Sequence, residues 1–488
     1  MSLYRRLCGH AQFQPDKPAI ESEAGILTYH QLHVLTDQCA DYFVASGLQR
    51  GDRIAILALN HPDWFIVLFA AAKLGIMVVP LNWRLSVDEL RFMTTDCEPQ
   101  FILHDAEFAD AAGQLVDADQ CIAIGHNDFP PQAEPCNATS PGSASADSEL
   151  LIVYTSGTTG QPKGAVLTQK ALLCSAEMSQ HMVDLTATDR VLNVLPLFHV
   201  GGLNIQPLPA LLYGATLVSH QRFDPQRAIA SLAGDGITLM NSVPTLLQAI
   251  LATDQWQTAN LHTLRAFSIG STDVPLPLIQ AVHKKGIPLI QVYGATEMAP
   301  VAIYQRIEHA KIEGTIGRAG VLNDIRLVND QGQPVACGES GEIQVRGNNL
   351  LTRYWNNTAA TDAAITDDWF GSGDVAHCDD KGFYWFDDRL KHVIISGGEN
   401  IYPAELERLI RELPGVAEVA VVGKPDDQWG EVPYAVVVKS SADVQSDTVM
   451  ATCAGIARFK QPKGVLFVDA LPRNALGKVV VPEVKALL

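Results

Sequence analysis

The chain has 488 residues, of which 47% are hydrophobic and 18% are charged, so it can bury a large core and is long enough for two or more domains. It carries 35 lysines and arginines against 54 aspartates and glutamates, a formal net charge of −19. Such a charge repels phosphate backbones and anionic lipid, which argues against nucleic acid as a partner. The nine cysteines are scattered without a C-x-x-C pair, as expected for reduced residues in a cytoplasmic protein.

The N-terminal segment, residues 1–17, contains Arg5 and Arg6 but no apolar run after them, so it does not read as a secretory signal. The longest apolar run, Trp64 to Val79, is interrupted by Lys73 and Gly75 and is shorter than a bilayer requires. We expect a buried helix followed by a strand there, and no membrane span.

Helical and strand patterns alternate along most of the chain. The helical pattern Asp63–Lys73 precedes GIMVVPLN, Pro225–Ala233 precedes ITLMNSVP, and Pro277–Lys284 precedes IPLIQVYG. This alternation is typical of parallel sheets with crossover helices, and it predicts an α/β fold.

From about Ile325 the pattern changes to short strands and turns, which predicts a small β unit. Further on, Leu406, Leu409, Ile410 and Leu413 recur at helical spacing before Pro414-Gly415, and the strand-like runs EVAVVG and YAVVVK follow. The last hundred or so residues therefore read as a compact α+β domain.

The run YTSGTTGQPKG, residues 154–164, follows the apolar residues 150–153. Its glycines let backbone N–H groups turn toward an anion, and its hydroxyls add donors and a metal-ligand oxygen. It does not fit the Walker loop spacing. A flexible linker is the alternative, but a lysine between proline and glycine directly after a strand favours binding of a nucleoside triphosphate or a similar ligand.

The same run resembles the signature loop of the adenylate-forming superfamily, which contains acyl-CoA synthetases, luciferases and peptide-synthetase adenylation domains. Further motifs of that superfamily follow in order: LPLFHVGG (195–202), VYGATE (292–297), GEIQVRG (341–347), GSGDVA (371–376), DRLKHVIISGGENIYP (388–403) and PRNALGK (472–478). With AAAKLGIMVVPLN at 70–82, the chain is most similar to an acid:CoA ligase.

The resemblance implies a large N-terminal domain, residues 1–390, built of αβ-layered subdomains with a small β-barrel-like unit. It also implies a mobile C-terminal domain, residues 391–488, that rotates about a hinge at Lys391 and carries a catalytic lysine.

The reaction implied has two steps and uses ATP, Mg²⁺ and coenzyme A. A carboxylate attacks the α-phosphate of ATP and pyrophosphate leaves, and a thiol then attacks the acyl-adenylate. Because both reactants of the first step are anions, groups that neutralise charge should dominate.

By this resemblance Lys478 bridges the carboxylate and the α-phosphate, Thr158 and Glu297 place Mg²⁺, and His199 acts beside the carboxylate. Tyr293 lies against adenine, Gln291 reads its edge, and Asp374 with Arg389 holds the ribose. Coenzyme A passes Gly397 and Gly398 and meets Trp429. The remaining cofactor-binding residues implied are Thr155, Ser156, Gly157, Thr159, Gly160, Lys163, Gly270, Ser271, Gly294 and Thr296.

The acid pocket implied is lined by His199, Gly202, Val243, Thr245, Ser271, Thr272 and Met298. None of these is an aspartate for an α-amino group or an arginine for a second carboxylate, which favours an aliphatic or aryl monocarboxylic acid with an apolar body. The hydroxyls of Ser271 and Thr272 keep a succinylbenzoate-type substrate open. The other alternative is a ligase that loads the phosphopantetheine of a carrier protein, and a homodimer is left open.

Overall fold

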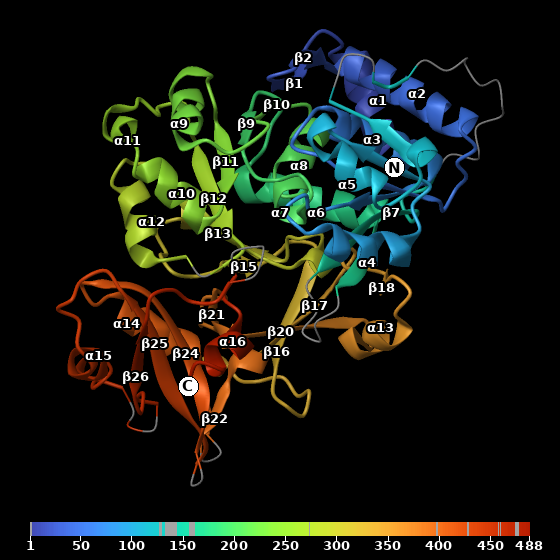
Figure 1. Ribbon diagram of the computed structural model, residues 1–488. Helices are drawn as coiled ribbons and strands as arrows, with labels where there is room; N and C mark the ends of the chain where they lie inside the picture. Colours follow the sequence, from blue (N-terminus) through green and yellow to red (C-terminus); the bar gives the residue numbers. More distant parts are fainter. Residues whose placement is uncertain are drawn as a thin grey trace. The chain divides into compact units, whose positions relative to one another are not determined.

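A computed structural model describes residues 2–125, 129–131, 144–155, 162–272, 274–396, 399–426, 429–456, 458, 460–473 and 478–488 (Figure 1). These residues form two compact units, Met1–Ile325 with Val345–Phe370 and Arg326–Gln344 with Gly371–Leu488. The predicted α/β class with a separate α+β C-terminal part is confirmed. Among the described helices none is long and apolar enough to cross a membrane.

The first unit contains a seven-stranded sheet in which five neighbouring strands, β7 to β6, run parallel. β8 and β18 continue this sheet antiparallel beyond β7. The strand order is β18 (Arg353–Tyr354), β8 (Lys163–Thr168), β7 (Glu149–Thr155), β4 (Met77–Pro80), β3 (Arg53–Leu57), β5 (Phe101–His104) and β6 (Cys121–Ala123).

The second sheet of this unit has nine strands, and its central strands, β13 to β1, run parallel. Its order is β15 (Arg318–Ala319), β14 (Ile303–Tyr304), β13 (Leu289–Tyr293), β12 (Ala266–Gly270), β11 (Leu239–Ser242), β9 (Arg190–Asn193), β10 (Thr216–Ser219), β1 (Pro18–Ser22) and β2 (Gly25–Thr28).

The three predicted helix–strand pairs are present. α3 (Asp63–Leu74) precedes β4, α9 (Pro225–Gly234) precedes β11, and α12 (Leu276–His283) precedes β13. α3 is buried on nearly all sides, as its apolar stretch Trp64–Ala72 requires, and it ends before Gly75, which has φ of 77°.

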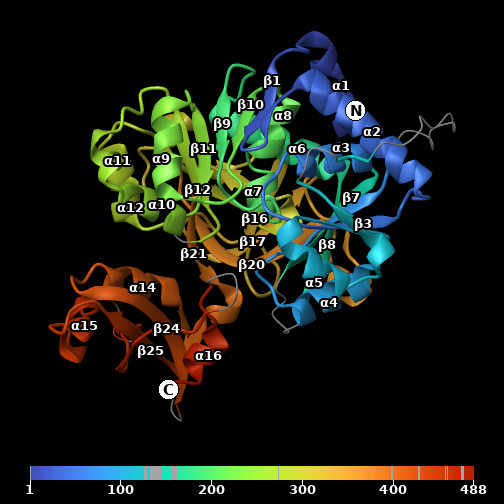
Figure 2. The same ribbon diagram turned by 45° about the horizontal axis from the view of Figure 1, so that its top comes forward.

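Helices cover both faces of the nine-stranded sheet. α9, α10 (Pro244–Leu251), α11 (Asp254–Thr258) and α12 pack a shared core on one face, around Phe267 and Met240 (Figure 1). On the other side α6 (Gln169–Val183) packs against β8 and α8 (Pro207–Leu212), and α8 packs against β9 and β10. Both ribbon views show α6 and α8 between the two sheets (Figure 2).

The N-terminal region has further α-helices besides these. α1 (Leu3–Phe13), α2 (Tyr29–Ala45) and α3 pack on one another. α4 (Val87–Cys97), α5 (Ala109–Gly113) and α13 (Thr358–Ala364) complete the set, with the short α7 (Val200–Leu203).

The predicted small β unit is a five-stranded sheet of β16 (Asn323–Val328), β17 (Gly341–Gly347), β20 (Trp369–Cys378) and β19 (Ile365–Thr366), with β21 (Tyr384–Arg389) paired antiparallel to β20. The C-terminal α+β region has the sheet β23 (Glu399–Ile401), β22 (Ile394–Ser396), β25 (Gly430–Lys439) and β24 (Val416–Asp426), with β26 (Val465–Val468) on β25. α14 (Pro403–Arg411), α15 (Ser446–Thr452) and α16 (Val481–Lys485) accompany it.

α14 is the predicted amphipathic helix, and its Leu406 and Ile410 are fully buried. Residues 371–390 belong to the same compact unit as α14, whereas the predicted boundary lies at Lys391. Because that boundary concerns a rotation, it stays a prediction.

Candidate active site

The predicted phosphate- and adenine-binding residues of the first unit follow the carboxyl ends of three strands. Thr155 ends β7, Gly270 ends β12, and Tyr293 ends β13. Ligands of open α/β sheets bind beyond the carboxyl ends of their strands, so this placement fits a nucleotide site.

Glu297 lies at the centre of a hydrogen-bond cluster in this region. Its Oε1 accepts a hydrogen bond from the Tyr354 hydroxyl at 2.8 Å and a longer one from Thr155 Oγ1 at 3.4 Å. The Lys163 ammonium lies 5.4 Å from the centre of the Tyr354 ring, which is a cation–π contact. The structure therefore brings together three of the predicted residues, Thr155, Lys163 and Glu297.

Tyr354 is the member of this cluster that the sequence analysis missed. It stands on β18, which pairs with β8 so that Tyr354 is opposite Ala165. Burial and the neighbouring Glu297 carboxylate raise the pKa of Tyr354, so it remains a hydroxyl that donates to Glu297 at neutral pH.

A carboxylate and a hydroxyl at the end of β7 are hard oxygen donors of the kind that Mg²⁺ prefers. Of the two residues predicted to place Mg²⁺, Thr158 lies outside the described residues. The Glu297 carboxylate, with the neighbouring Thr155 hydroxyl, fits such a site in donor chemistry. Bound there, the ion would neutralise phosphate charge.

Glycines allow two close backbone approaches at this end of the sheet. A Cβ on Gly294 would lie 1.7 Å from the Pro300 carbonyl oxygen, and one on Gly270 would lie 2.3 Å from the Val292 carbonyl oxygen. Any side chain at either position would displace the backbone that carries the motif VYGATE.

Asn349, a second residue that the sequence analysis missed, forms hydrogen bonds with the loop that follows Gly294. The buried Asn349 side chain donates to the carbonyl oxygens of Met298 and Val301, both at 2.9 Å. Leu351 N donates to the Glu297 carbonyl oxygen at 2.8 Å. These bonds fix the short 3-10 turn Thr296–Met298 and therefore the direction of Glu297.

Gln291, predicted to read the adenine edge, is buried in β13, and its side-chain amide donates to the Thr315 carbonyl oxygen at 2.8 Å. Its amide nitrogen is therefore used within the protein, and its predicted contact with adenine stays a prediction. Tyr293, predicted to stack on adenine, is 9% exposed at the end of the same strand.

The predicted acid pocket is spread over several elements. His199 precedes α7, with its ring centroid 4.5 Å from that of Phe198. Trp83 meets the Phe198 ring edge-on at 6.0 Å, and the Arg84 guanidinium lies 5.7 Å from the same ring. The sequence analysis did not connect Trp83 or Arg84 with this segment.

Other predicted pocket residues differ widely in exposure. Met298 is fully buried, Val243 is half-buried, and Thr245, Ser271 and Thr272 are exposed. Ser271 has φ of 78°, a left-handed conformation that is uncommon outside glycine. A Cβ on Gly202 would lie 2.1 Å from the Pro196 carbonyl oxygen, so this turn after His199 also requires glycine.

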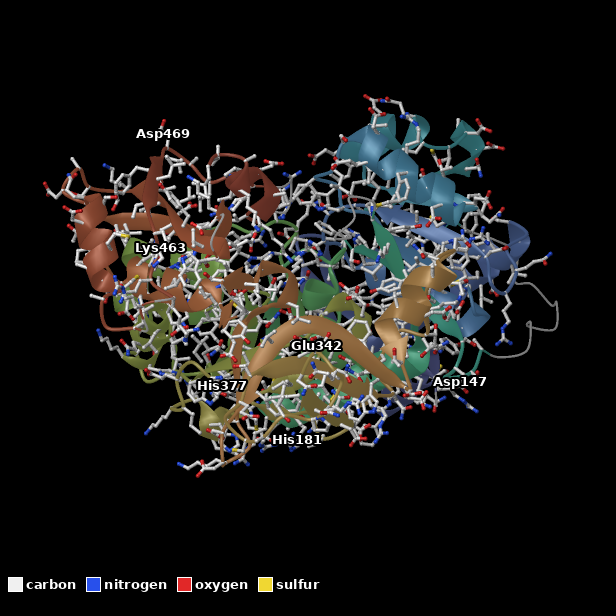
Figure 3. All side chains as sticks on the ribbon, turned by 90° about the horizontal axis from the view of Figure 1, so that it is seen from below. Asp147, His181, Glu342, His377, Lys463 and Asp469 are labelled. Atoms are coloured by element: carbon white, nitrogen blue, oxygen red, sulfur yellow. The ribbon has the colours of Figure 1, made fainter. Side chains whose placement is uncertain are left out.

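In the second unit the predicted ribose-binding pair is assembled. Asp374 on β20 lies opposite Arg389 on β21, and Arg389 Nε is 3.1 Å from Asp374 Oδ1. The turn before Asp374 is fixed because Gly373 N donates to Glu342 Oε1 at 2.9 Å; Glu342 is labelled in Figure 3. Asp374 is 8% exposed, so this carboxylate is largely buried beside Arg389.

Asp388 connects this pair to the predicted hinge. Its two carboxylate oxygens accept hydrogen bonds from Arg389 N at 2.6 Å and from Ala404 N at 2.7 Å, so it caps the first turn of α14. Lys391 lies in the 3-10 turn Leu390–His392 and is exposed.

Trp429 is 47% exposed directly before β25, and Lys478 is exposed near the C-terminus. Several predicted residues lie outside the described residues: Ser156, Gly157, Thr158, Thr159, Gly160, Gly397 and Gly398.

The sequence of this chain is similar to known families and known enzymes. The AMP-binding enzyme family matches residues 9–355, and the AMP-binding enzyme C-terminal domain matches residues 405–478. The chain is 43% identical to an indoleacetate–CoA ligase of Aromatoleum aromaticum over 501 residues, covering 100% of this chain and 98% of the relative. It is 38% identical to a feruloyl-CoA synthase of Amycolatopsis over 485 residues, covering 97% and 96%.

Solved structures agree over the whole chain. The o-succinylbenzoate CoA synthetase MenE of Bacillus subtilis, in complex with its acyl-adenylate intermediate, gives a TM-score of 0.88 at 32% identity, covering 99% of this chain and 98% of that one. ATP-bound MatB of Rhodopseudomonas palustris gives a TM-score of 0.91 at 29% identity, covering 100% and 99%.

Proposed function

Because the chain belongs to the AMP-binding enzyme family and is an AMP-forming acid:CoA ligase, we propose that its acid is an aryl monocarboxylate. The observation that carries this choice is the 43% identity, over the full chain, to an indoleacetate–CoA ligase. Identity to a feruloyl-CoA synthase supports it, whereas a long-chain-fatty-acid–CoA ligase and a 2-succinylbenzoate–CoA ligase are 35% and 34% identical.

In the first step the acid carboxylate attacks the α-phosphate of ATP. Lys163 and the Glu297 cluster bind the phosphates, and Asp374 with Arg389 holds the ribose. Glu297 and Thr158 would hold Mg²⁺, which would neutralise phosphate charge. Lys478 supplies the positive charge between the two reacting anions, and His199 lies beside the carboxylate. Preorganised charge of this kind is usually the largest contribution to such a step.

In the second step the thiol of coenzyme A attacks the acyl-adenylate and AMP leaves. We assign Lys391 as the hinge of the C-terminal region between the two steps, Gly397 and Gly398 to the path of the pantetheine arm, and Trp429 to the CoA nucleotide. The exposed indole of Trp429 is available for stacking. A cytoplasmic location and a homodimer also remain proposals.

A panel of acids tests the choice of substrate. Indole-3-acetate, ferulate, phenylacetate, palmitate and succinylbenzoate are each supplied with ATP and Mg²⁺, and AMP is measured with and without CoA. We expect CoA-dependent AMP from the aryl monocarboxylates and little from palmitate or succinylbenzoate. Preference for palmitate or succinylbenzoate overturns the assignment of an aryl acid as the substrate. AMP formation that requires a carrier protein in place of CoA overturns the assignment of CoA as the acyl acceptor.

A further inference from the structure

A row of buried polar side chains runs from the turn after His199 to the nine-stranded sheet. Gln206 Nε2 donates to Ser268 Oγ at 3.2 Å, and Ser268 Oγ donates to Asn241 Oδ1 at 2.8 Å. Asn241 Nδ2 donates to the Gly201 carbonyl oxygen at 3.2 Å. Asn241 and Ser268 are register partners on β11 and β12, so they share one face of the sheet.

Two amides in this region have unused hydrogen-bonding atoms. Asn204 is 1% exposed, and neither Nδ2 nor Oδ1 has a partner among the residues that the structure describes. Gln206 is equally buried, and its Oε1 is likewise unpartnered within the described part of the chain.

Unpaired amides of this kind are costly. A buried donor or acceptor without a partner keeps the full penalty of its lost hydration, and the large majority of buried side-chain polar atoms in folded proteins are paired. Leucine would fill the same buried space without this cost, so a carboxamide there indicates a polar ligand group or an ordered water.

The position of these amides relates them to the acid. Asn204 ends α7, which begins directly after His199, and Ser268 lies on the strand that leads to Gly270 and Ser271. A Cβ added to Gly201 would meet only Ile205 Cδ1, at 4.0 Å, so the backbone of this turn borders open space. At Gly202 a Cβ would overlap the Pro196 carbonyl oxygen. Of these two glycines, only Gly201, whose carbonyl oxygen accepts the hydrogen bond from Asn241, could accommodate a further atom without a clash.

We propose that Asn204 and Gln206 recognise a hydrogen-bonding group on the ring of the acid, such as an indole N–H or a phenol O–H. The proposal rests on the proposed aryl-acid function and narrows it. A carboxamide offers both a donor and an acceptor, so it pairs with either group. A purely hydrocarbon ring leaves the amides unpaired, and sites built for a polar group reject analogues that lack it.

The test compares acids that differ in one group. Indole-3-acetate is paired with benzothiophene-3-acetate, in which sulfur replaces N–H, and 4-hydroxyphenylacetate is paired with phenylacetate. For at least one pair we expect kcat/KM for CoA-dependent AMP formation to favour the polar acid by about 10-fold or more. Asn204→Leu or Gln206→Leu should bring the ratio toward one, mainly through a higher KM for the polar acid.

Thr36→Val is the matched control, because Thr36 Oγ1 on α2 is also buried and unpartnered among the described residues. It should leave both ratios unchanged. A ratio within a pair cancels any loss of folded enzyme, so a destabilised variant still gives an answer.

The outcomes separate this inference from the proposed function. Near-equal use of both members of each pair by the wild type overturns the polar recognition and leaves the aryl-acid function standing. A strong polar preference that survives both leucine variants overturns the assignment to Asn204 and Gln206. Failure to activate any aryl acid overturns both proposals.

Discussion

The Glu297 carboxylate accepts two hydroxyl hydrogen bonds, and we assign it to Mg²⁺. Glu297→Gln replaces a charged ligand by a neutral amide, which is a poorer ligand for a hard cation. We expect a loss of activity at low Mg²⁺ that high Mg²⁺ partly restores. Calorimetry of Mg·ATP binding should show the same weakening, and a Mg²⁺ dependence like that of the wild type would remove Glu297 from the metal.

Tyr354→Phe tests the same carboxylate through its partner. The change removes the 2.8 Å hydrogen bond to Glu297 but keeps the aromatic ring that makes the cation–π contact with Lys163. Because a hydrogen bond to a charged group contributes about 1.5–3 kcal/mol, we expect about a 10-fold or larger loss in kcat/KM at limiting Mg²⁺. Tyr29→Phe, which removes a buried hydroxyl that donates to Ala215 O, is the control. A similar loss in both variants would mean that Tyr354 acts only on stability.

Motif residues could be predicted from the sequence, and their supporting residues could not. Lys163, Thr155 and Glu297 stand in runs whose composition or resemblance points to phosphate chemistry. Tyr354 lies 57 positions from Glu297 and stands on a two-residue strand, which is too short to give a periodic signal. The amide of Asn204, which has no partner among the described residues, has no signature in sequence, because only its burial makes it unusual.

At the scale of elements, the turn after β13 depends on a glycine. Gly294→Ala would place a Cβ 1.7 Å from the Pro300 carbonyl oxygen, so the loop that carries Glu297 must shift. We expect a large loss of ATP binding, measured by calorimetry, together with a lower Tm. Gly9→Ala in α1 is the control, because no atom lies within 4 Å of the new Cβ and alanine favours helix. Unchanged ATP binding by Gly294→Ala would mean that the turn does not position the nucleotide.

His392 lies in the 3-10 turn at the predicted hinge. Its pKa is lowered to about 4 by burial and by the neighbouring cations Lys391 and Arg389. An unfolded histidine titrates near pH 6.5, so the unfolded chain binds more protons between about pH 6.5 and 4. Stability should therefore fall as the pH falls through this window.

His392→Gln removes this titration and should reduce the fall. Tm measured from pH 7.5 to 4.5 should show the variant gaining on the wild type as the pH drops. Parallel curves for the two proteins would mean that His392 is protonated as easily in the folded protein as in the unfolded one.

Elements with a long regular pattern were the predictable ones. α3 and α14 follow from an apolar run and from helical spacing. α3 ends before Gly75, and α14 ends at Arg411, three residues before Pro414. The two-residue strands β14, β15 and β18 exist only because distant segments pair, which local sequence does not encode.

For the whole molecule, we have proposed that the C-terminal region changes its pose about Lys391 between the two steps. Lys391→Pro fixes φ near −65° and restricts the residue before it. We expect acid-dependent exchange of pyrophosphate into ATP to survive within about tenfold, whereas thioester formation from supplied acyl-adenylate falls much further. Survival of both reactions would place the hinge elsewhere, and a melting curve would reveal a damaged fold if both were lost.

Lys478→Ala should show the opposite pattern. Removal of one preorganised positive group typically costs about 10²- to 10³-fold in rate, so adenylation should fall by that much while thioester formation from supplied acyl-adenylate continues. Equal losses in the two half-reactions would contradict the role of Lys478 in the first step.

The central claim is that the acid is activated as an acyl-adenylate, and the fate of its carboxylate oxygens tests this claim most directly. An aryl acid that the enzyme activates is labelled with ¹⁸O in both carboxylate oxygens and incubated with ATP, Mg²⁺ and CoA, and the products are analysed by mass spectrometry. Attack of the carboxylate on the α-phosphate predicts that one labelled oxygen appears in AMP and none in pyrophosphate. Label in inorganic phosphate together with ADP, or unlabelled AMP, would contradict an acyl-adenylate mechanism.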